Sequence, residues 1–423
     1  ACDVCANCTY QTIQAAITGM AEGSTIKIGD GAYTEDLTID KDLTLRACNG
    51  DPVSIQNATL SGRVIQRQDN SGDPVALTIT DITIDRNTGH QTGGGIFGYF
   101  NLTLNGTTII QNSRGGEAGG GVELGDGSPP WEYGQAPLPC TFIMEGEAAV
   151  RSNIAGGYGG GVWFGCRGGE AIIRGSASVT SNSSGEWGGG IGLADKTTLT
   201  VTGDATILGN YSDYRGGGFM CVIDCDVILS GNASLIKNRA DSDGGGGMIY
   251  DVGTVTMSGN ARIEENVVGE AGGGLDLYED GKLTMNDDSA IRGNSAVYGS
   301  GAFDYHYDPS HEDLCVIMND RAVIEDNISV AAEEPGGWNG GSGVFVTGGG
   351  STRLNDSSAI RNNTTTGNGG GVHAEGNVVL RGTSSIEGNH ADGTGGGIYL
   401  ERSSATATVG ANATLANNTP NDC

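Results

Sequence analysis

The chain has few aromatic residues, few basic residues and no long hydrophobic run. Phenylalanine, tryptophan and tyrosine make up 6% of its 423 residues, and 22 lysines and arginines stand against 51 aspartates and glutamates. The resulting net charge of −29 argues against binding to nucleic acid or to an anionic membrane surface. No apolar stretch is long enough to cross a bilayer, so membrane insertion is not expected. No cofactor is predicted; an acidic surface can bind Ca²⁺ through scattered carboxylates, but the calcium-binding nonapeptide repeat is absent.

Glycine, in contrast, is abundant and periodic. It occupies 76 positions, and a Gly-Gly-Gly turn followed by an apolar residue recurs about every 28 residues, with Ser in the middle of two copies. A fixed period of this length is typical of one structural unit stacked many times. Glycine suits such a turn because it tolerates positive φ and a close approach of the next unit. The copies begin at Gly93, Gly119, Gly159, Gly188, Gly216, Gly245, Gly272, Gly299, Gly341, Gly369 and Gly395.

A second motif keeps the same period. It reads as a small residue, an aliphatic residue, two free positions and an asparagine, as in the segment from Ala261 to Asn266. Asparagine can adopt the left-handed conformation at a turn, and stacked asparagines can hydrogen-bond to one another. Both motifs therefore have a structural explanation. The terminal asparagines are Asn112, Asn153, Asn182, Asn210, Asn238, Asn266, Asn294, Asn327, Asn363, Asn389 and Asn418.

The segments between the motifs predict strands. The run from Thr198 to Thr202 and the residues after each glycine turn alternate apolar and polar positions, and no stretch with helical periodicity separates them. A phosphate-binding glycine loop would need a following helix and a Lys-Ser/Thr pair, which are absent. The sequence predicts an all-β fold, a right-handed parallel β-helix: a solenoid with three short strands per rung.

The first fifty residues differ from the rest. Ile13, Ala16 and Ile17 share one face of a predicted amphipathic helix, which would cap the open core of a solenoid. We therefore expect residues 1–50 to form an N-terminal cap with the first rungs, and residues 51–423 to continue as β-helix repeats within one domain. No distinct cap is evident at the other end, so a partner, a loop or the next subunit is expected to cover the last rung.

Ten cysteines indicate an oxidising, extracellular setting, and the opening Ala1-Cys2-Asp3 is typical of a mature secreted chain. The protein is expected to be secreted or on the cell surface, and its Asn-X-Ser/Thr sequences make it a candidate glycoprotein. The closely spaced N-terminal cysteines lack a second ligand pair, so no metal site is predicted. The expected disulfides are Cys221 with Cys225, Cys140 with Cys166, and Cys48 with Cys5 or one of its neighbours Cys2 and Cys8.

Two stretches resemble known families. The segment Tyr10-Gln11-Thr12-Ile13-Gln14-Ala15-Ala16-Ile17 and the strand-like residues after it, over residues 9–50, resemble the start of the pectin-lyase-like β-helix superfamily. Residues 93–418 are similar to the repeats of chlamydial polymorphic membrane proteins, which pair Gly-Gly-small-aliphatic with Phe-x-x-Asn; here Ile, Leu or Val replaces Phe. The resemblance implies a parallel β-helix, with pectinesterases, lyases and carbohydrate-binding proteins among its relatives.

The catalytic motifs of those enzymes are missing. There is no Asp-Phe-Ile/Val run, no Gly-Arg-Pro-Trp and no cluster of arginines of the kind that pectate lyases use. One constellation remains: Asp276, Asp304 and His306 are expected to face outward on adjacent rungs, where two carboxylates could act as acid and base on a glycosidic bond. The alternative is a solvated acidic face.

Aromatic residues at outward positions suggest a second kind of site. Trp163, Tyr278 and Tyr399 would bind sugar rings if they are exposed, whereas the alternative for tryptophan is packing over the glycine turns.

The leading functional hypothesis is a secreted, non-enzymatic structural or adhesive protein. It would self-associate head to tail into a fibre, with N-terminal cysteines of one subunit linked to C-terminal ones of the next. The alternatives are a polysaccharide lyase or glycoside hydrolase, and a glycan-binding module. The cysteines proposed for intermolecular links are Cys2, Cys8, Cys315 and Cys423.

Overall fold

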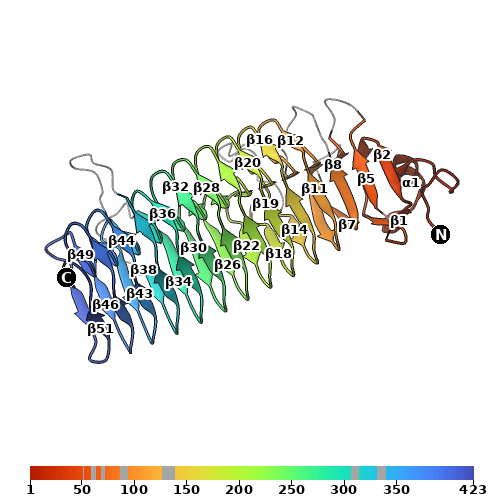
Figure 1. Cartoon of the computed structure of the whole chain (residues 1–423). Coiled ribbons are helices and arrows are strands. Elements are labelled where there is room, and N and C mark those ends of the chain that lie inside the picture. Colours follow the sequence, from red (N-terminus) through yellow and green to blue (C-terminus); the bar gives the residue numbers. More distant parts are fainter. Residues whose placement is uncertain are drawn as a thin grey trace. The chain divides into compact units, whose positions relative to one another are not determined.

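A computed structural model describes residues 1–50, 52–58, 63–67, 72–85, 94–125, 139–305, 314–330 and 340–423. The chain divides into two compact units, Ala1–Ser212 and Asp213–Cys423. In each unit, short parallel strands form four sheets, A to D, and each turn of the chain adds one strand to each sheet once all four are present (Figure 1). The predicted parallel β-helix is thus confirmed. No helix in the described ranges is long and apolar enough to span a membrane.

In the first unit the strands of the sheets follow one another in chain order. Sheet A contains β1 (Ser24–Ile28), β4 (Leu43–Ala47), β7 (Val75–Thr80), β10 (Phe100–Asn105), β14 (Thr141–Met144), β18 (Glu170–Ile173) and β22 (Thr198–Val201). Sheet B contains β2 (Gly31–Thr34), β5 (Val53–Gln56), β8 (Ile82–Asp85), β11 (Ile109–Gln111), β15 (Ala149–Arg151), β19 (Ser178–Thr180) and β23 (Thr206–Leu208). Sheet C contains β3 (Leu37–Thr38), β6 (Ile65–Gln66), β9 (Ile96–Gly98), β13 (Val122–Leu124), β17 (Val162–Phe164) and β21 (Ile191–Leu193). Sheet D contains β12 (Arg114–Gly115), β16 (Ile154–Ala155), β20 (Ser183–Ser184) and β24 (Tyr211–Ser212).

The second unit repeats the arrangement. Sheet A contains β26 (Cys225–Leu229), β30 (Gly253–Met257), β34 (Gly281–Met285), β38 (Leu314–Met318), β42 (Ser351–Leu354), β46 (Val378–Leu380) and β50 (Ala407–Val409). Sheet B contains β27 (Ser234–Ile236), β31 (Arg262–Glu264), β35 (Ala290–Arg292), β39 (Val323–Glu325), β43 (Ala359–Arg361), β47 (Ser385–Glu387) and β51 (Thr414–Ala416). Sheet C contains β25 (Phe219–Cys221), β29 (Gly247–Ile249), β33 (Leu275–Tyr278), β37 (Ala302–Tyr305), β41 (Val344–Val346), β45 (Val372–Ala374) and β49 (Ile398–Leu400). Sheet D contains β28 (Arg239–Ala240), β32 (Val267–Val268), β36 (Ser295–Ala296), β40 (Ile328–Ser329), β44 (Thr364–Thr365) and β48 (His390–Ala391).

The core lies inside the coil of each unit, because strand residues alternate between the two faces of a sheet. In β30, Val255 and Met257 are buried, and they align with Leu283 and Met285 of β34. Threonines at the positions between them face outward and are only partly covered. Rungs in register therefore stack apolar side chains into continuous interior columns, which is what the alternation predicted.

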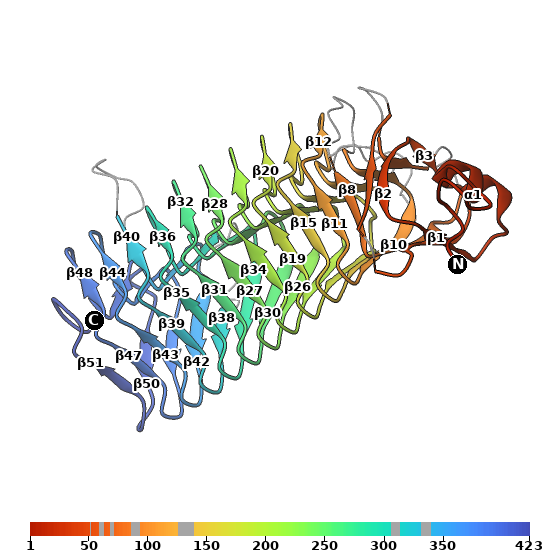
Figure 2. The same ribbon diagram turned by 45° about the vertical axis from the view of Figure 1, so that its right-hand side comes forward.

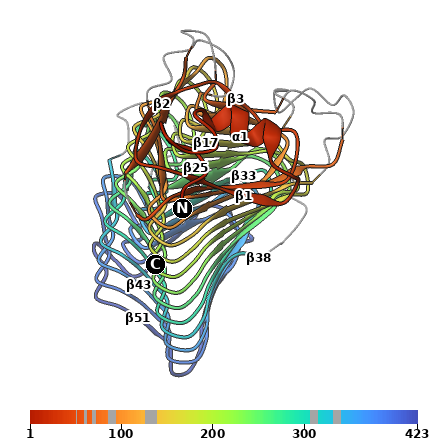
Figure 3. The ribbon, with the colours of Figure 1, turned by 90° about the vertical axis from the view of Figure 1, so that its right-hand side faces the viewer.

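The N-terminal helix α1 (Ile13–Gly19) is where the sequence placed it, beside β1 and β3 (Figure 3). Ile13, Ala16 and Ile17 are its buried residues, as expected. The Thr12 hydroxyl accepts a hydrogen bond from the Ala15 amide, and the Glu35 carboxylate accepts bonds from two further amides of the first turn. These acceptors satisfy amides that have no partner inside a helix, and they fix where it begins.

The sequence predicted three strands per rung and missed sheet D. Its two-residue strands form a row of their own in Figure 2. Each is followed by the glycine turn, which folds back over the outer face of sheet C. In the second unit this buries Ala271, Phe303 and Phe345 in a small apolar cluster outside the main core, with Tyr298 and Tyr305 packed against it. Outer positions of sheet C are thus buried as well.

The predicted asparagine ladder is present in both units. Asn266 is typical: its side-chain nitrogen donates to the Leu235 carbonyl and to Oδ1 of Asn294, at 3.1 and 2.9 Å. Asn112 is an exception, because Ser113 takes the ladder position and its backbone amide donates a hydrogen bond to Oδ1 of Asn153. The ladder runs through Asn153, Asn182 and Asn210 in the first unit, and through Asn238, Asn266, Asn294, Asn327, Asn363, Asn389 and Asn418 in the second.

The glycine turn depends on close packing between rungs. A Cβ on Gly246 would lie 2.4 Å from the Gly274 carbonyl oxygen of the next rung, so no side chain fits. The turn in this rung begins at Gly244, which has φ of 66°, and not at Gly245 as the sequence suggested. Gly247 instead occupies the strand position where the next rung has Leu275, and the Phe219 ring fills the space that its side chain would need.

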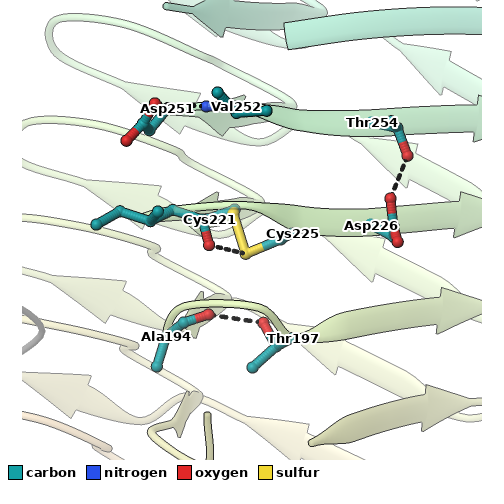
Figure 4. Close-up of a disulfide and its surroundings, with 9 residues drawn as sticks. Ala194, Thr197, Cys221, Cys225, Asp226, Asp251, Val252 and Thr254 are labelled. Carbon is teal, nitrogen blue, oxygen red and sulfur yellow. Dashed lines mark hydrogen bonds between the residues drawn. A yellow bond between two sulfur atoms is a disulfide. The ribbon is translucent and has the colours of Figure 1, made fainter. Parts of the chain in front are cut away.

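The structure contains four disulfides. Cys140–Cys166 and Cys221–Cys225 are the two pairs expected from spacing, and the second closes the short loop between β25 and β26 (Figure 4). Cys48 pairs with Cys2, and not with Cys5, which is bonded to Cys8. The N-terminal cysteines are thus consumed within the chain, so the predicted intermolecular role of Cys2 and Cys8 is wrong. Of the other two cysteines proposed for such links, Cys315 is buried and Cys423 is exposed.

The last glycine turn is covered by the chain itself, which is one of the expected alternatives. Residues that follow Asn418 return along this turn, and the amides of Gly397 and Ile398 donate to the carbonyls of Asn421 and Asp422. The Asp422 carboxylate also accepts from the backbone and side chain of Asn418, which ends the asparagine ladder.

Candidate functional site: a tyrosine strip beside a buried carboxyl cluster

Three of the side-chain columns of sheet C in the second unit bear on the site, and all are defined by the register of its strands. The inner column faces the core, the covered column lies outward beneath the glycine turns, and the third column lies outward at the carboxyl end of the strands. The inner column includes Ile249, Leu277, Asp304, Val346 and Ala374; the covered column includes Met248, Asp276, Phe303, Phe345, His373 and Tyr399; the third includes Tyr250, Tyr278 and Tyr305.

The predicted catalytic residues do not converge. Asp276 belongs to the covered column and is 1% exposed, whereas Asp304 aligns with Leu277 and is fully buried in the inner column. The two carboxyl groups therefore lie on opposite faces of the same sheet, and the expectation that Asp304 faces outward is wrong. Asp304 lies 28 residues after Asp276, but this rung is one residue shorter than the one before it, because the segment between Asn294 and Gly299 lacks a residue, so Asp276 aligns with Phe303. His306 lies outside the described residues.

Asp304 occupies an apolar position without a matching donor. Neither of its carboxyl oxygens has a well-aligned hydrogen-bond donor among the described residues. Burial raises the pKa of Asp304 to about 8, although the neighbouring Cys315 thiol opposes the shift. At neutral pH this side chain is a protonated acid inside the core. Without access to solvent it cannot act on a polymer outside the solenoid.

A polar cluster lies around Asp276 instead. Arg215 and Asp243 occupy equivalent positions immediately before two successive glycine turns, and Arg215 Nε lies 3.0 Å from Asp243 Oδ2. Burial raises the pKa of Asp276 well above its usual value, the Asp243 charge raises it further, and Arg215 lowers it. Asp243 also accepts a bond from Ser242. The sequence analysis missed this cluster because the residue before each glycine turn varies and has no pattern.

The third column is here named the tyrosine strip: Tyr250, Tyr278 and Tyr305. Their rings stack in parallel on consecutive rungs, with centroids 5.3 and 4.9 Å apart. Each tyrosine is half-buried, so ring edges and hydroxyl groups remain accessible. The Arg215 guanidinium lies 5.3 Å from the Tyr250 ring and 5.9 Å from the Tyr278 ring, which ties the strip to the buried cluster.

Carboxylates border the strip. Asp251 follows Tyr250, and Glu279 and Asp280 follow Tyr278 in the tight turn that leads to β34. Burial raises the pKa of Glu279, and the charges of Asp251 and Asp280 raise it further. The pKa of Tyr278 is raised by burial and by Glu279, while Arg215 acts in the opposite direction. The strip thus combines aromatic edges, hydroxyl groups and negative charge.

The other two predicted binding residues differ from Tyr278. Trp163 is 2% exposed and its ring fills the space above Gly192, so the packing alternative is correct and Trp163 has no surface for a sugar. Tyr399 is half-buried at the far end of the covered column, edge-on to the His373 ring at 4.8 Å. Of the three, only Tyr278 lies in an array of exposed aromatic rings.

Within the described part of the chain, no group of three or more His, Cys, Asp or Glu residues is arranged to hold a metal ion. The tyrosine strip and its border offer aromatic, hydroxyl and carboxylate groups. Protein-family models, curated proteins and solved structures were compared with the chain, and none matched.

Proposed function

We propose that this protein is a secreted, non-enzymatic solenoid that binds carbohydrate through the tyrosine strip. The observation that carries the proposal is the stack of Tyr250, Tyr278 and Tyr305 at the edge of sheet C. Tyrosine offers a rigid apolar ring with a hydrogen-bonding tip, and both features suit recognition of sugars, which have apolar faces and many hydroxyl groups.

The spacing of the strip supports an extended ligand. Successive tyrosine rings lie 5.3 and 4.9 Å apart, which reflects the separation of adjacent strands. This repeat is close to the length of one sugar unit in an extended polysaccharide. Because each ring face is covered by the next ring, contacts would come from ring edges and hydroxyl groups, one rung for each sugar. A chain lying along the strip would then meet equivalent groups repeatedly.

The proposal keeps secretion, and it limits self-association to non-covalent contacts. The four disulfides favour an oxidising compartment. A head-to-tail fibre would need non-covalent contacts, since the N-terminal thiols are already bonded within the chain. A lyase or hydrolase centred on Asp276 and Asp304 is not favoured, because both carboxyl groups are buried and lie on opposite faces of the sheet.

The test is a binding screen of the full chain against soluble oligosaccharides and insoluble polysaccharides, with product analysis in parallel. We expect binding without new reducing ends or unsaturated products. Tyr278→Ala should weaken binding by about tenfold or more, because removal of the central ring also disorders its two neighbours.

The control is Tyr211→Ala, another half-buried tyrosine, which belongs to β24 of sheet D in the first unit. It should bind as the unmodified protein does. Turnover of any polymer, or binding that Tyr278→Ala leaves intact while the variant remains folded, would contradict the proposal.

A further inference from the structure

The carboxylates beside the tyrosine strip indicate which class of sugar the strip would bind. Asp251 and Glu279 each follow a strip tyrosine on neighbouring rungs, so their positions repeat with the rings. Their mutual repulsion contributes to the raised pKa of Glu279. Two carboxylates held close together are stabilised when a cation binds between them.

Arg215 does not supply the positive charge that would stabilise Asp251 and Glu279. Arg215 is already paired with Asp243 at 3.0 Å, and its side chain is only 18% exposed. Its guanidinium lies on the Tyr214 and Tyr250 side of the strip and interacts with the ring faces. The strip therefore presents to solvent an aromatic array next to uncompensated negative charge from Asp251 and Glu279.

An aromatic ring and a carboxylate together are a common receptor for an organic ammonium group, since both attract positive charge. A neutral sugar would gain only hydrogen bonds from its hydroxyl groups to the carboxylates, whereas an ammonium group would gain charge attraction as well, and a uronic acid would be repelled. The net charge of −29 acts in the same direction, because it raises the local concentration of a cationic polymer near the protein.

We infer that the tyrosine strip selects polysaccharides that carry protonated amino groups, with Asp251 and Glu279 receiving the ammonium groups. This inference rests on the proposed carbohydrate binding and adds the class of sugar. A polymer of glucosamine has the required chemistry: pyranose units for the tyrosine edges and one amine on each unit, at the repeat of the rungs.

The experiment compares two hexasaccharides with the same backbone, fully deacetylated and fully acetylated chitohexaose, by calorimetry on the full chain at about pH 6. Aspartate and glutamate of ordinary pKa are ionised there, and a bound ammonium group favours the ionised form of Glu279. We expect the deacetylated form to bind about tenfold tighter. That advantage should shrink in 1 M salt, which screens surface charges to within about 3 Å. Glu279→Gln and Asp251→Asn should remove most of it and leave affinity for the acetylated form unchanged.

The matched control is Glu147→Gln, which removes an exposed carboxylate of the first unit and should keep the full preference. Equal affinity for the two hexasaccharides would overturn the inference while leaving carbohydrate binding in place, provided that Tyr278→Ala still abolishes it. Absence of binding to both would overturn the inference, and the wider polysaccharide screen would then decide the proposed function separately.

Discussion

At the scale of the residue, asparagine recurs at one position of successive rungs because its side-chain amide can form hydrogen bonds to the rungs on both sides. The Asn266 amide donates to Leu235 and Asn294 and accepts from the backbone and side-chain nitrogens of Asn238. All of these groups are buried, so each bond replaces one that water would otherwise supply. Asparagine is the residue that can donate and accept in both directions along the stack.

Replacing Asn266 by alanine should therefore be costly. The change removes the acceptor of the backbone and side-chain nitrogens of Asn238 and the side-chain donor to the Leu235 carbonyl, and we expect a loss of about 2–4 kcal/mol in the free energy of unfolding. Urea denaturation followed by circular dichroism measures it. Asn412→Ala, at an exposed turn, should change the stability by less than about 0.5 kcal/mol; an equal effect at both positions would argue against the ladder as a stabilising element.

Asp304 gives a pH-dependent prediction. Its folded pKa of about 8 lies above the ordinary aspartate value, so the unfolded chain loses this proton first as the pH rises. The cost of keeping Asp304 in the core therefore grows from about pH 4 to about pH 8 and is constant above that. Asp304→Leu, which copies Leu277 of the preceding rung, should be more stable than the unmodified chain, with an advantage that increases over this range.

Thermal unfolding at several pH values checks this prediction. Near pH 4 the two proteins should differ only by the change in packing, and at pH 8 the variant should unfold several degrees higher. Glu147→Gln serves as the comparison for an exposed carboxylate. A difference that does not vary with pH would show that Asp304 titrates normally.

The residue scale also shows what sequence alone could not give. The strand after each glycine turn was recognised by alternation, but alternation has no absolute phase in a segment of three or four residues. A shift of one residue exchanges inner and outer faces, and Asp304 was assigned to the wrong one. Asparagine positions were more reliable because the residue type itself marks the ladder; the failure at Asn112 arose where Ser113 replaces the ladder residue.

At the scale of the element, strands of adjacent rungs compensate for one another. Phe219 in β25 is fully buried, and its ring occupies the volume above Gly247 in β29. Large and small residues at facing positions keep the interior close to native packing density. Sheet D and the covered column follow the same principle outside the main core, with Phe303, Phe345 and Tyr298 in edge-to-face contact.

This compensation can be measured with a double-mutant cycle. Gly247→Val alone should destabilise the protein by about 1–3 kcal/mol through overpacking, and Phe219→Val alone by a similar amount through loss of buried surface. The double variant should be more stable than the sum of the two changes predicts, by about 1 kcal/mol or more. Additive effects would mean that the two positions do not share the same space.

The element scale explains why sheet D and the tyrosine strip escaped prediction. Strands of two residues are too short for any periodicity, and they were read as part of the loop before the glycines. The covered column exists only because that loop folds back, so Trp163 and Asp276 were assigned to the surface when both are buried. Tyr278 was identified correctly as outward, since it lies beyond the edge of the covering turn.

At the scale of the whole molecule, the disulfides limit covalent assembly. Eight cysteines are bonded in four pairs, and Cys423 is the exposed thiol that remains. One exposed thiol per chain can form a dimer but cannot form an open polymer. On non-reducing gels we therefore expect monomer with at most a dimer band, and Cys423→Ser should remove the dimer. A ladder of higher species would show that the N-terminal disulfides exchange between chains.

The class of fold was predictable because the glycine turn and the asparagine motif recur many times along the chain. Single errors, such as the start of the turn at Gly244, did not affect the period. The site has no such redundancy. Arg215, Asp243 and the strip tyrosines are brought together by the offset of successive rungs, and they belong to segments that look unrelated in the sequence.

The asparagine ladder has an evolutionary consequence. Neighbouring ladder residues are 28, 33, 36 and 26 positions apart between Asn266 and Asn389, yet their Nδ2–Oδ1 distances are 2.9, 3.0, 2.9 and 3.0 Å. The hydrogen bonds of the ladder are nearly the same whatever the number of residues in a rung. Insertions and deletions at the corners of a rung therefore disturb the neighbouring rungs little. Loops can then diversify under selection while the scaffold is inherited unchanged, which makes the corners natural places to graft foreign peptides.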